Sequence, residues 1–161
     1  MKKPDTPGVI APPPVLVVGA IVLGLLLDGL FPAYVIAVLL PHGDHRLVGS
    51  VLLVAAILLT IPAVRAFRHA GTHPEPWKPA TALVTDGIFH FLRNPMYVGM
   101  LLFVAGLAFL TASDWMLVMT IVLAVVLHIG VVRREERYLE AKFGEAYRRY
   151  CESVPRYGWP F

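Results

Sequence analysis

The chain has 161 residues, of which 57% are apolar, and its mean hydropathy of +0.68 is too high for an ordinary soluble domain. This length has room for one compact unit, so we expect a single membrane-embedded domain over residues 1–161. The net charge of +3 and the pI of about 9.2 fit basic segments beside a membrane and need no nucleic acid. The lone cysteine, Cys151, excludes an internal disulfide framework.

Four apolar runs decide the fold class. The first, residues 9–27, includes prolines at positions 12, 13 and 14, which we expect to delay the helix until about Val15. Three further runs of 18 residues contain no Asp, Glu, Lys or Arg: 47–64, 95–112 and 115–132. A bilayer core needs about 20 apolar residues, so each run spans it once its flanks are included. The prediction is an all-α polytopic membrane protein with four transmembrane helices, the first being a retained helix rather than a signal peptide.

Charge placement predicts the orientation of these helices. Of the 14 Lys and Arg residues, Arg46 alone falls in the loop after the first helix. The others precede helix one, lie between helices two and three, or follow helix four. By the positive-inside rule, both termini and the 65–94 loop lie in the cytoplasm. We therefore expect an integral protein of a bacterial-type inner membrane with its active site on the cytoplasmic side.

The connecting segments carry local signals. Residues 35–40 form an apolar stretch too short to span, which we expect to be re-entrant or interfacial on the outer side. The inner loop 66–94 is proline-rich and long for so small a protein, which indicates a function. Asn94 is a preferred N-cap with Pro95 at the first helical position, and Ser113 is the expected N-cap of helix four.

Helix four is predicted to continue past the membrane, through Arg133, to about Tyr150 as a C-terminal cytoplasmic helix. This extension carries an apolar stripe at three- and four-residue spacing, formed by Leu139, Phe143, Tyr147 and Tyr150. Gly144 is a candidate interruption of the helix.

Two polar clusters stand where apolar runs meet the same membrane face. One is residues 93–99 (RNPMYVG) before the third span, and the other is Glu135-Glu136 after the fourth. Free amides and the positive dipole end at the start of helix three suit an anionic ligand group. His128 lies seven residues before Glu135, so both share a helix face, and ionisable groups at membrane depth are usually functional. The alternative is a solvated, salt-bridged helix start without a ligand.

Other chemistries are not indicated. The histidine pairs 42/45 and 69/73 lie on opposite sides of the membrane and lack the further ligands that zinc requires, so no metal site is predicted. No two glycines have G-x-G spacing, which leaves no dinucleotide fingerprint or Walker loop, and no nucleophile motif is present.

The combined motifs are specific, although each alone is weak. They are Leu83-Val84 with Gly87, residues 93–99, Glu135-Glu136, Phe143-Gly144, Tyr147, Tyr150 and residues 154–156. Over roughly residues 66–161 this pattern resembles the isoprenylcysteine carboxyl methyltransferase family, which belongs to a wider group of integral-membrane methyltransferases that includes the phospholipid N-methyltransferases. The latter typically carry a G-x-G cofactor loop, so they are the weaker match. The chain also departs from the family at Asn94, where the commonest motif has His, and at Val131, where eukaryotic members place a substrate-binding Arg.

The resemblance implies that S-adenosylmethionine is the cofactor, held between the membrane helices and covered by the C-terminal segment. The residues that match cofactor-binding positions are Thr81, Ala82, Leu83, Val84, Phe89, Asn94, Pro95, Met96, Tyr97 and Glu135. The catalytic candidates are Glu136, as a second contact beside Glu135, and Arg133 and Arg134, as substitutes for the missing substrate-binding Arg.

The predicted function is methyl transfer to a carboxylate, or another nucleophile, of a lipid-like or small apolar acceptor that enters from the bilayer. A carboxylate is already ionised at neutral pH, whereas an amine needs a base, for which Glu135 or Glu136 would serve. Phe89 and Tyr97 are expected to face the sulfonium cation. The expected partners are this acceptor and membrane lipids, without nucleic acid or metal. Two alternatives are a sterol-type reductase that uses NADPH and a small non-enzymatic membrane scaffold.

Overall fold

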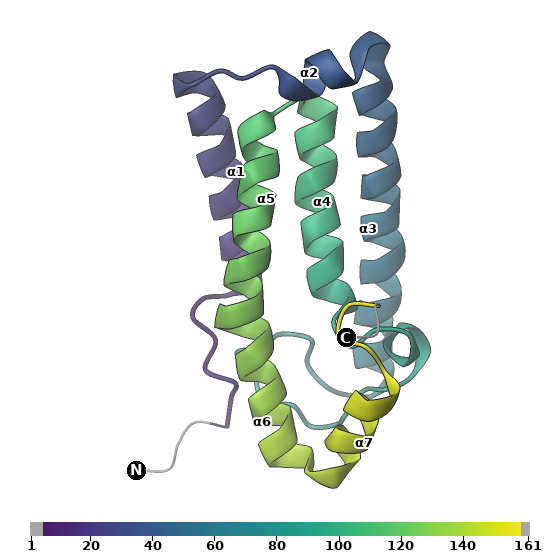
Figure 1. Ribbon diagram of the computed structural model, residues 1–161. Helices are drawn as coiled ribbons and strands as arrows, with labels where there is room; N and C mark the ends of the chain where they lie inside the picture. Colours follow the sequence, from purple (N-terminus) through teal and green to yellow (C-terminus); the bar gives the residue numbers. More distant parts are fainter. Residues whose placement is uncertain (1–4, 159–161) are drawn as a thin grey trace.

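The computed structural model describes residues 5–158, and the regular structure within them is entirely helical (Figure 1). This confirms the all-α prediction. The elements in chain order are α1 (Pro13–Leu30), α2 (Val35–Leu39), η1 (Pro41–Gly43), α3 (Asp44–His69), η2 (Gly87–His90), α4 (Pro95–Thr111), α5 (Asp114–Leu127), η3 (His128–Val132), α6 (Arg133–Phe143) and α7 (Glu145–Ser153).

Four helices, α1, α3, α4 and α5, run side by side as an up-and-down bundle, with α4 between α3 and α5 (Figure 1). Small residues allow close backbone approach between them. A Cβ added at Gly49 of α3 would lie 2.7 Å from the Gly106 carbonyl oxygen of α4, and one added at Gly24 of α1 would lie 2.7 Å from the Cα of Met116 in α5. Close packing of this kind drives helix association where the surroundings are lipid. The bundle therefore contains two tight pairs, α3–α4 and α1–α5.

Within residues 5–158, three helical stretches are long and apolar enough to cross a membrane: Pro13–Leu30, Asp44–His69 and Asp114–Phe143. The fourth predicted span corresponds to α4, which is apolar but shorter, with 17 residues.

Two helix starts differ from the prediction. α1 begins at Pro13 rather than at about Val15, because first-turn N–H groups have no partner inside the helix and a proline there loses no hydrogen bond. α3 begins at Asp44 and continues to His69, beyond both ends of the apolar run 47–64. Charged residues end an apolar run without ending the helix, so the length of the apolar run underestimates the length of α3.

At one end of the bundle, α2 lies across the helix ends (Figure 1). The Asp114 carboxylate holds it there, because it accepts hydrogen bonds from the backbone N–H groups of Val35 and Ile36 at 2.8 and 2.9 Å. Ser113 is the N-cap of α5, as predicted, and its Oγ accepts a hydrogen bond from Met116 N at 3.1 Å. The short apolar stretch is thus a helix fixed to the start of α5.

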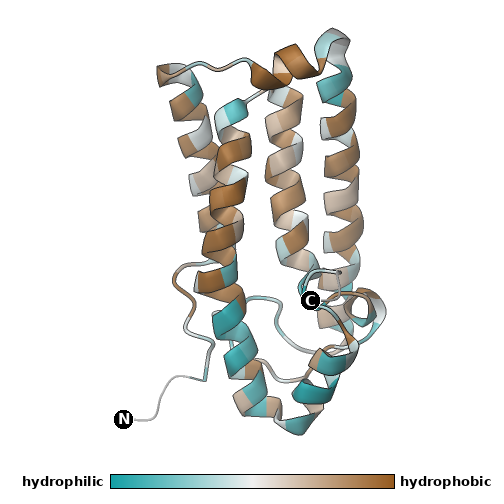
Figure 2. Cartoon of the chain, in the orientation of Figure 1, coloured by the Kyte–Doolittle hydropathy of each residue, from teal (hydrophilic) through white to brown (hydrophobic). Residues whose placement is uncertain are grey.

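At the other end, α5, η3 and α6 form one helical rod of 30 residues whose surface changes from apolar to polar at α6 (Figure 2). η3 is a π-helical turn, a feature frequent at functional sites. The rod ends at Gly144, whose φ of 55° disfavours a side chain, and α7 turns back toward the bundle (Figure 1). The predicted extension past Arg133 and the interruption at Gly144 are confirmed.

Candidate functional site

A cavity of about 810 Å³, open mouth included, lies where α4 begins and α6 continues the rod. Segments distant in sequence line this α4–α6 cavity: Pro7, Phe67 of α3, the loop between α3 and α4, the first turn of α4, α6 and α7. Figure 1 places the loop, α6 and α7 together at one end of the bundle.

Tyr97 and Glu135 meet in this cavity. The Tyr97 hydroxyl donates a hydrogen bond of 2.7 Å to Glu135 Oε2, which joins the two polar clusters across 38 residues of sequence. A hydrogen bond to a carboxylate in a site shielded from water is stronger than one between neutral groups. The two clusters therefore form one site.

Asn94 occupies the N-cap position of α4, but its side chain does not cap the helix. Its Nδ2 instead donates to the carbonyl oxygen of Arg156, at 3.2 Å. The amides in the first turn of α4 therefore receive no hydrogen bond from the Asn94 side chain beside the cavity, which is where a helix attracts an anionic group.

Aromatic side chains form one wall of the cavity. Phe89 packs edge-on against Phe67 with ring centroids 5.2 Å apart, and its carbonyl oxygen accepts a hydrogen bond of 2.6 Å from the Tyr150 hydroxyl. Burial raises the pKa of both Tyr147 and Tyr150 above the ordinary value, so both phenols stay protonated at neutral pH. This wall offers apolar surface with neutral hydroxyls.

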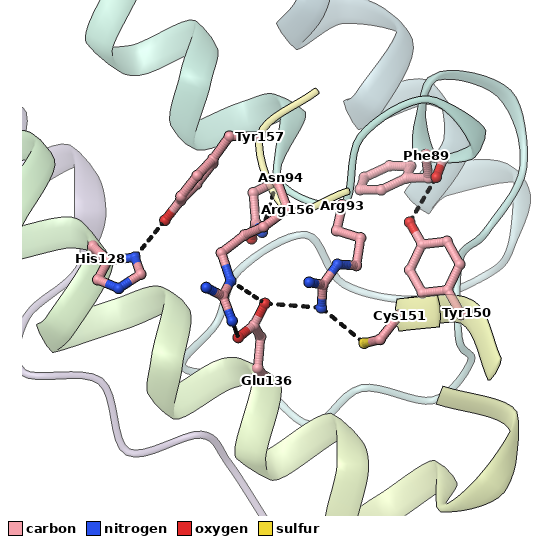
Figure 3. A network of polar contacts seen from close by, with 9 residues as sticks. All are labelled: Phe89, Arg93, Asn94, His128, Glu136, Tyr150, Cys151, Arg156 and Tyr157. Atoms are coloured by element: carbon pink, nitrogen blue, oxygen red, sulfur yellow. Dashed lines mark hydrogen bonds and ion pairs between the residues drawn. The ribbon is translucent and has the colours of Figure 1, made fainter. Parts of the chain in front are cut away.

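Glu136 is held between two arginines (Figure 3). Arg156 donates from Nε and Nη2 to the two carboxylate oxygens at 2.8 and 2.7 Å, and Arg93 Nη1 lies 3.0 Å from Oε1. The hydrogen bonds to Glu136 raise the pKa of Arg156 above its usual value. The Arg93 Nη1 also donates to the Cys151 sulfur at 2.7 Å. Glu136 thus links α6 to both the start of α4 and the end of the chain.

These contacts fix a C-terminal strap, residues 154–158, beside the cavity (Figure 3). Besides the Arg156 pair, Arg93 N donates to the Pro155 carbonyl at 3.0 Å. The Tyr157 hydroxyl lies 2.8 Å from His128 Nδ1 in η3. The strap therefore bridges the start of α4 and the rod.

Most residues singled out from the sequence line the α4–α6 cavity. They are Ala82, Leu83, Val84, Phe89, Asn94, Pro95, Met96, Tyr97, Glu135 and Glu136. Thr81 does not line it, because its hydroxyl donates to the Gly71 carbonyl at 3.1 Å and its amide donates to Thr72. Arg133 and Arg134 are exposed on the rod outside the cavity, and Arg134 donates to the Gly8 carbonyl. Their predicted roles toward ligands remain predictions.

His128 and Glu135 engage different partners, Tyr157 and Tyr97 respectively. The prediction that they share a face assumed regular α-helical geometry between them. The π-helical turn at His128–Val132 interrupts that geometry.

The sequence reasoning missed several lining residues. His73, Glu75 and Lys78 line the cavity from the loop, and Tyr138 lines it from α6. Tyr138 also joins distant segments, because its hydroxyl accepts from Ala80 N at 3.1 Å and bonds Asp5 Oδ1 at 2.9 Å. The available signal was the proline-rich stretch 74–79, whose stiffness suits a fixed wall.

Fold and site together define a class: a helical protein with membrane-length apolar helices and, where they end, a cavity lined by Tyr97, Glu135 and Glu136. Residues 45–146, more than half of the chain, match the phospholipid methyltransferase family. The chain belongs to that family. It does so without the G-x-G spacing, whose absence makes the phospholipid enzymes the weaker match by motif alone.

A curated relative agrees with the resemblance seen in the motifs. The chain is 37% identical over 76 residues to a protein-S-isoprenylcysteine O-methyltransferase of Schizosaccharomyces pombe. The match covers 45% of this chain, and the chain spans 31% of the length of that relative. No solved structure matches the chain.

Proposed function

We propose that this protein is an S-adenosylmethionine-dependent methyltransferase that works in the membrane and methylates a carboxylate, or another nucleophile, of a lipid-like acceptor. The observation that carries the proposal is the hydrogen bond between Tyr97 and Glu135, because it joins both polar clusters inside one cavity. If the two clusters served only to begin and end helices, Tyr97 and Glu135 would not need to contact each other. Family membership over residues 45–146 is independent support.

The lining suits a donor that combines a ring system, a cation and a carboxylate. Phe89 and residues 82–84 offer apolar surface for the adenine ring. Glu135 and the Tyr97 ring suit the sulfonium cation, and the first turn of α4 suits the carboxylate. When bound, S-adenosylmethionine supplies an electrophilic methyl group. The residues of this chain hold it, orient it and exclude water, which are the main contributions a protein makes to an in-line transfer.

The two neighbouring glutamates receive different roles in this proposal. Glu136 is engaged by two guanidinium groups, so we assign it to holding the strap rather than to accepting a proton. In the described part of the chain, the Glu135 side chain accepts one hydrogen bond, from Tyr97, and it faces the cavity. A carboxylate acceptor needs no base, whereas an amine acceptor would have Glu135 as its candidate base.

Arg133 and Arg134 are assigned to the surface around the site. Both are exposed on the rod just after its apolar part ends. A cation there would meet an anionic head group of a lipid or of the acceptor as it approaches from the bilayer.

The proposed topology has four spans, with both termini and the cavity on the cytoplasmic side. The 17 residues of α4 extend roughly 25 Å, and a few flanking residues make up the rest of a core of about 30 Å. Reporter fusions after residue 161 and within the connection between α1 and α2 test this arrangement. Both fusions reporting the same compartment would refute it.

Calorimetry with S-adenosylhomocysteine tests the function. Purified protein in nanodiscs is expected to bind it, and Tyr97→Phe and Glu135→Gln are expected to bind it more weakly. Tyr34→Phe is the matched control, because Tyr34 is exposed and directly precedes α2, which lies at the other end of the bundle. Binding of NADPH instead would favour the reductase, and binding of neither ligand would favour the scaffold.

An experiment with a labelled methyl donor identifies the methyl acceptor. Membranes with and without the protein are incubated with methyl-labelled S-adenosylmethionine, and the lipid extracts are compared by mass spectrometry. A labelled species that requires both the protein and Glu135 identifies the acceptor class. Label confined to the aqueous fraction would exclude a lipid-like acceptor.

A further inference from the structure

One carboxylate in the α4–α6 cavity, that of Glu75, has a hydrogen-bond partner in the described chain on only one of its two oxygens. Glu75 lines the cavity from the loop, and its Oε1 accepts a hydrogen bond of 3.0 Å from Lys78 Nζ. Its Oε2 is buried and has no hydrogen-bond partner among residues 5–158. The Nδ1 atom of His73 is 3.8 Å from Oε2, which is beyond hydrogen-bonding distance.

An unpartnered buried acceptor is costly, so native structures rarely keep one without a reason. Pro74 and Pro76 flank Glu75 and restrict the backbone, so the loop keeps this residue beside the cavity. A second buried atom without a partner in the described chain, Arg93 Nε, belongs to another residue that lines the same cavity. Both unsatisfied atoms therefore point to a ligand in this cavity.

The ionisation of Glu75 defines which ligand group it can bind. The hydrogen bond from Lys78 lowers the pKa of the Glu75 carboxyl below its usual value, so the group is an anion at neutral pH. An ionised carboxylate only accepts hydrogen bonds, and its complement is an N–H or O–H donor, preferably a charged one.

We propose that Glu75 is a cofactor-binding residue whose Oε2 accepts a hydrogen bond from the methyl donor. This inference rests on the proposed function. S-adenosylmethionine has three groups with the required chemistry: the α-ammonium, the ribose hydroxyls and the adenine amino group. Glu75 lies outside the motifs that carry the family resemblance, so the resemblance did not single it out.

Calorimetry on the full chain in nanodiscs tests the proposal with wild type, Glu75→Gln and a control, Glu152→Gln. Glu152 is exposed on α7 and does not line the cavity. Glu75→Gln should weaken S-adenosylhomocysteine binding by about tenfold, whereas the control should not change it. Methylthioadenosine, which keeps the adenine and the ribose but lacks the ammonium, separates the ammonium from the other two donors. An equal loss for both ligands assigns the contact to the nucleoside, and a loss for S-adenosylhomocysteine alone assigns it to the ammonium.

Thermal unfolding without ligand separates binding from a structural role. The Lys78 and Glu75 side chains are 43% and 33% exposed, so their ion pair is partly solvated and contributes little. Glu75→Gln should therefore unfold at or above the wild-type Tm. If that variant does not fold, Glu75→Asp withdraws the carboxylate by one methylene and carries the same expectation for affinity. Wild-type affinity in the variant, or a loss that accompanies a lower Tm, overturns the inference while leaving the proposed function intact. Absence of binding by the wild type overturns both.

Discussion

Replacing Glu136 by glutamine should destabilise the protein more than removing its partner Arg156. Glu136 and Arg93 are both nearly buried, with side-chain exposures of 15% and 11%, whereas Arg156 is 34% exposed. In Glu136→Gln, the Arg93 guanidinium loses its carboxylate and stays buried. In Arg156→Ala, Arg93 and Glu136 still pair with each other.

The expected magnitudes follow from this difference in burial. Removing one partner of a buried ion pair costs about 3–5 kcal/mol, because the remaining charge is left uncompensated. The glutamine oxygen can still accept one hydrogen bond, so we expect about 3 kcal/mol for Glu136→Gln. Arg156 is partly solvated and leaves no isolated charge behind, so its removal should cost about 1 kcal/mol.

Thermal unfolding in a single detergent, monitored by tyrosine and tryptophan fluorescence, shows which of the two variants is less stable. Hydrogen exchange at the amides of Arg93 and Val154 reports whether the strap loosens, since both amides are hydrogen-bonded in or beside it. Glu140→Gln is the control, because Glu140 is exposed on the same helix. An Arg156→Ala variant as unstable as Glu136→Gln would refute the reasoning. A Glu136→Gln variant with wild-type Tm but no activity would restore Glu136 as a catalytic residue.

Three further substitutions are informative. Tyr97→Phe should lower S-adenosylhomocysteine affinity by about tenfold in calorimetry, since Glu135 loses its hydrogen bond; unchanged affinity would place the pair outside the site. Gly49→Ala should lower the Tm, because its Cβ would lie 2.7 Å from two backbone atoms of α4, whereas Gly19→Ala meets open space and should not. Gly144→Ala should cost about 1–3 kcal/mol in unfolding measurements because φ there is positive, and an unaltered Tm would show that the rod can end without this conformation.

Much of the architecture followed from signals carried by near neighbours in the chain. Apolar runs predicted the four bundle helices, Ser113 predicted the start of α5, and Gly144 predicted the end of the rod. These features depend on side-chain size, capping and backbone freedom within a few residues. The motif resemblance added the residues 82–84, 94–97 and 135 that now line one cavity.

What only the tertiary structure decided is how each side chain is used. Neighbouring residues on a helix point about 100° apart, so Glu135 meets Tyr97 of α4 while Glu136 meets Arg93 and Arg156. No sequence pattern shows that Thr81 bonds back to its own loop, that Arg133 lies outside the cavity, or that one oxygen of Glu75 is unpartnered. Such contacts depend on where segments tens of residues apart come to rest against each other. Packing of the whole bundle sets those positions, and local sequence preferences do not encode them.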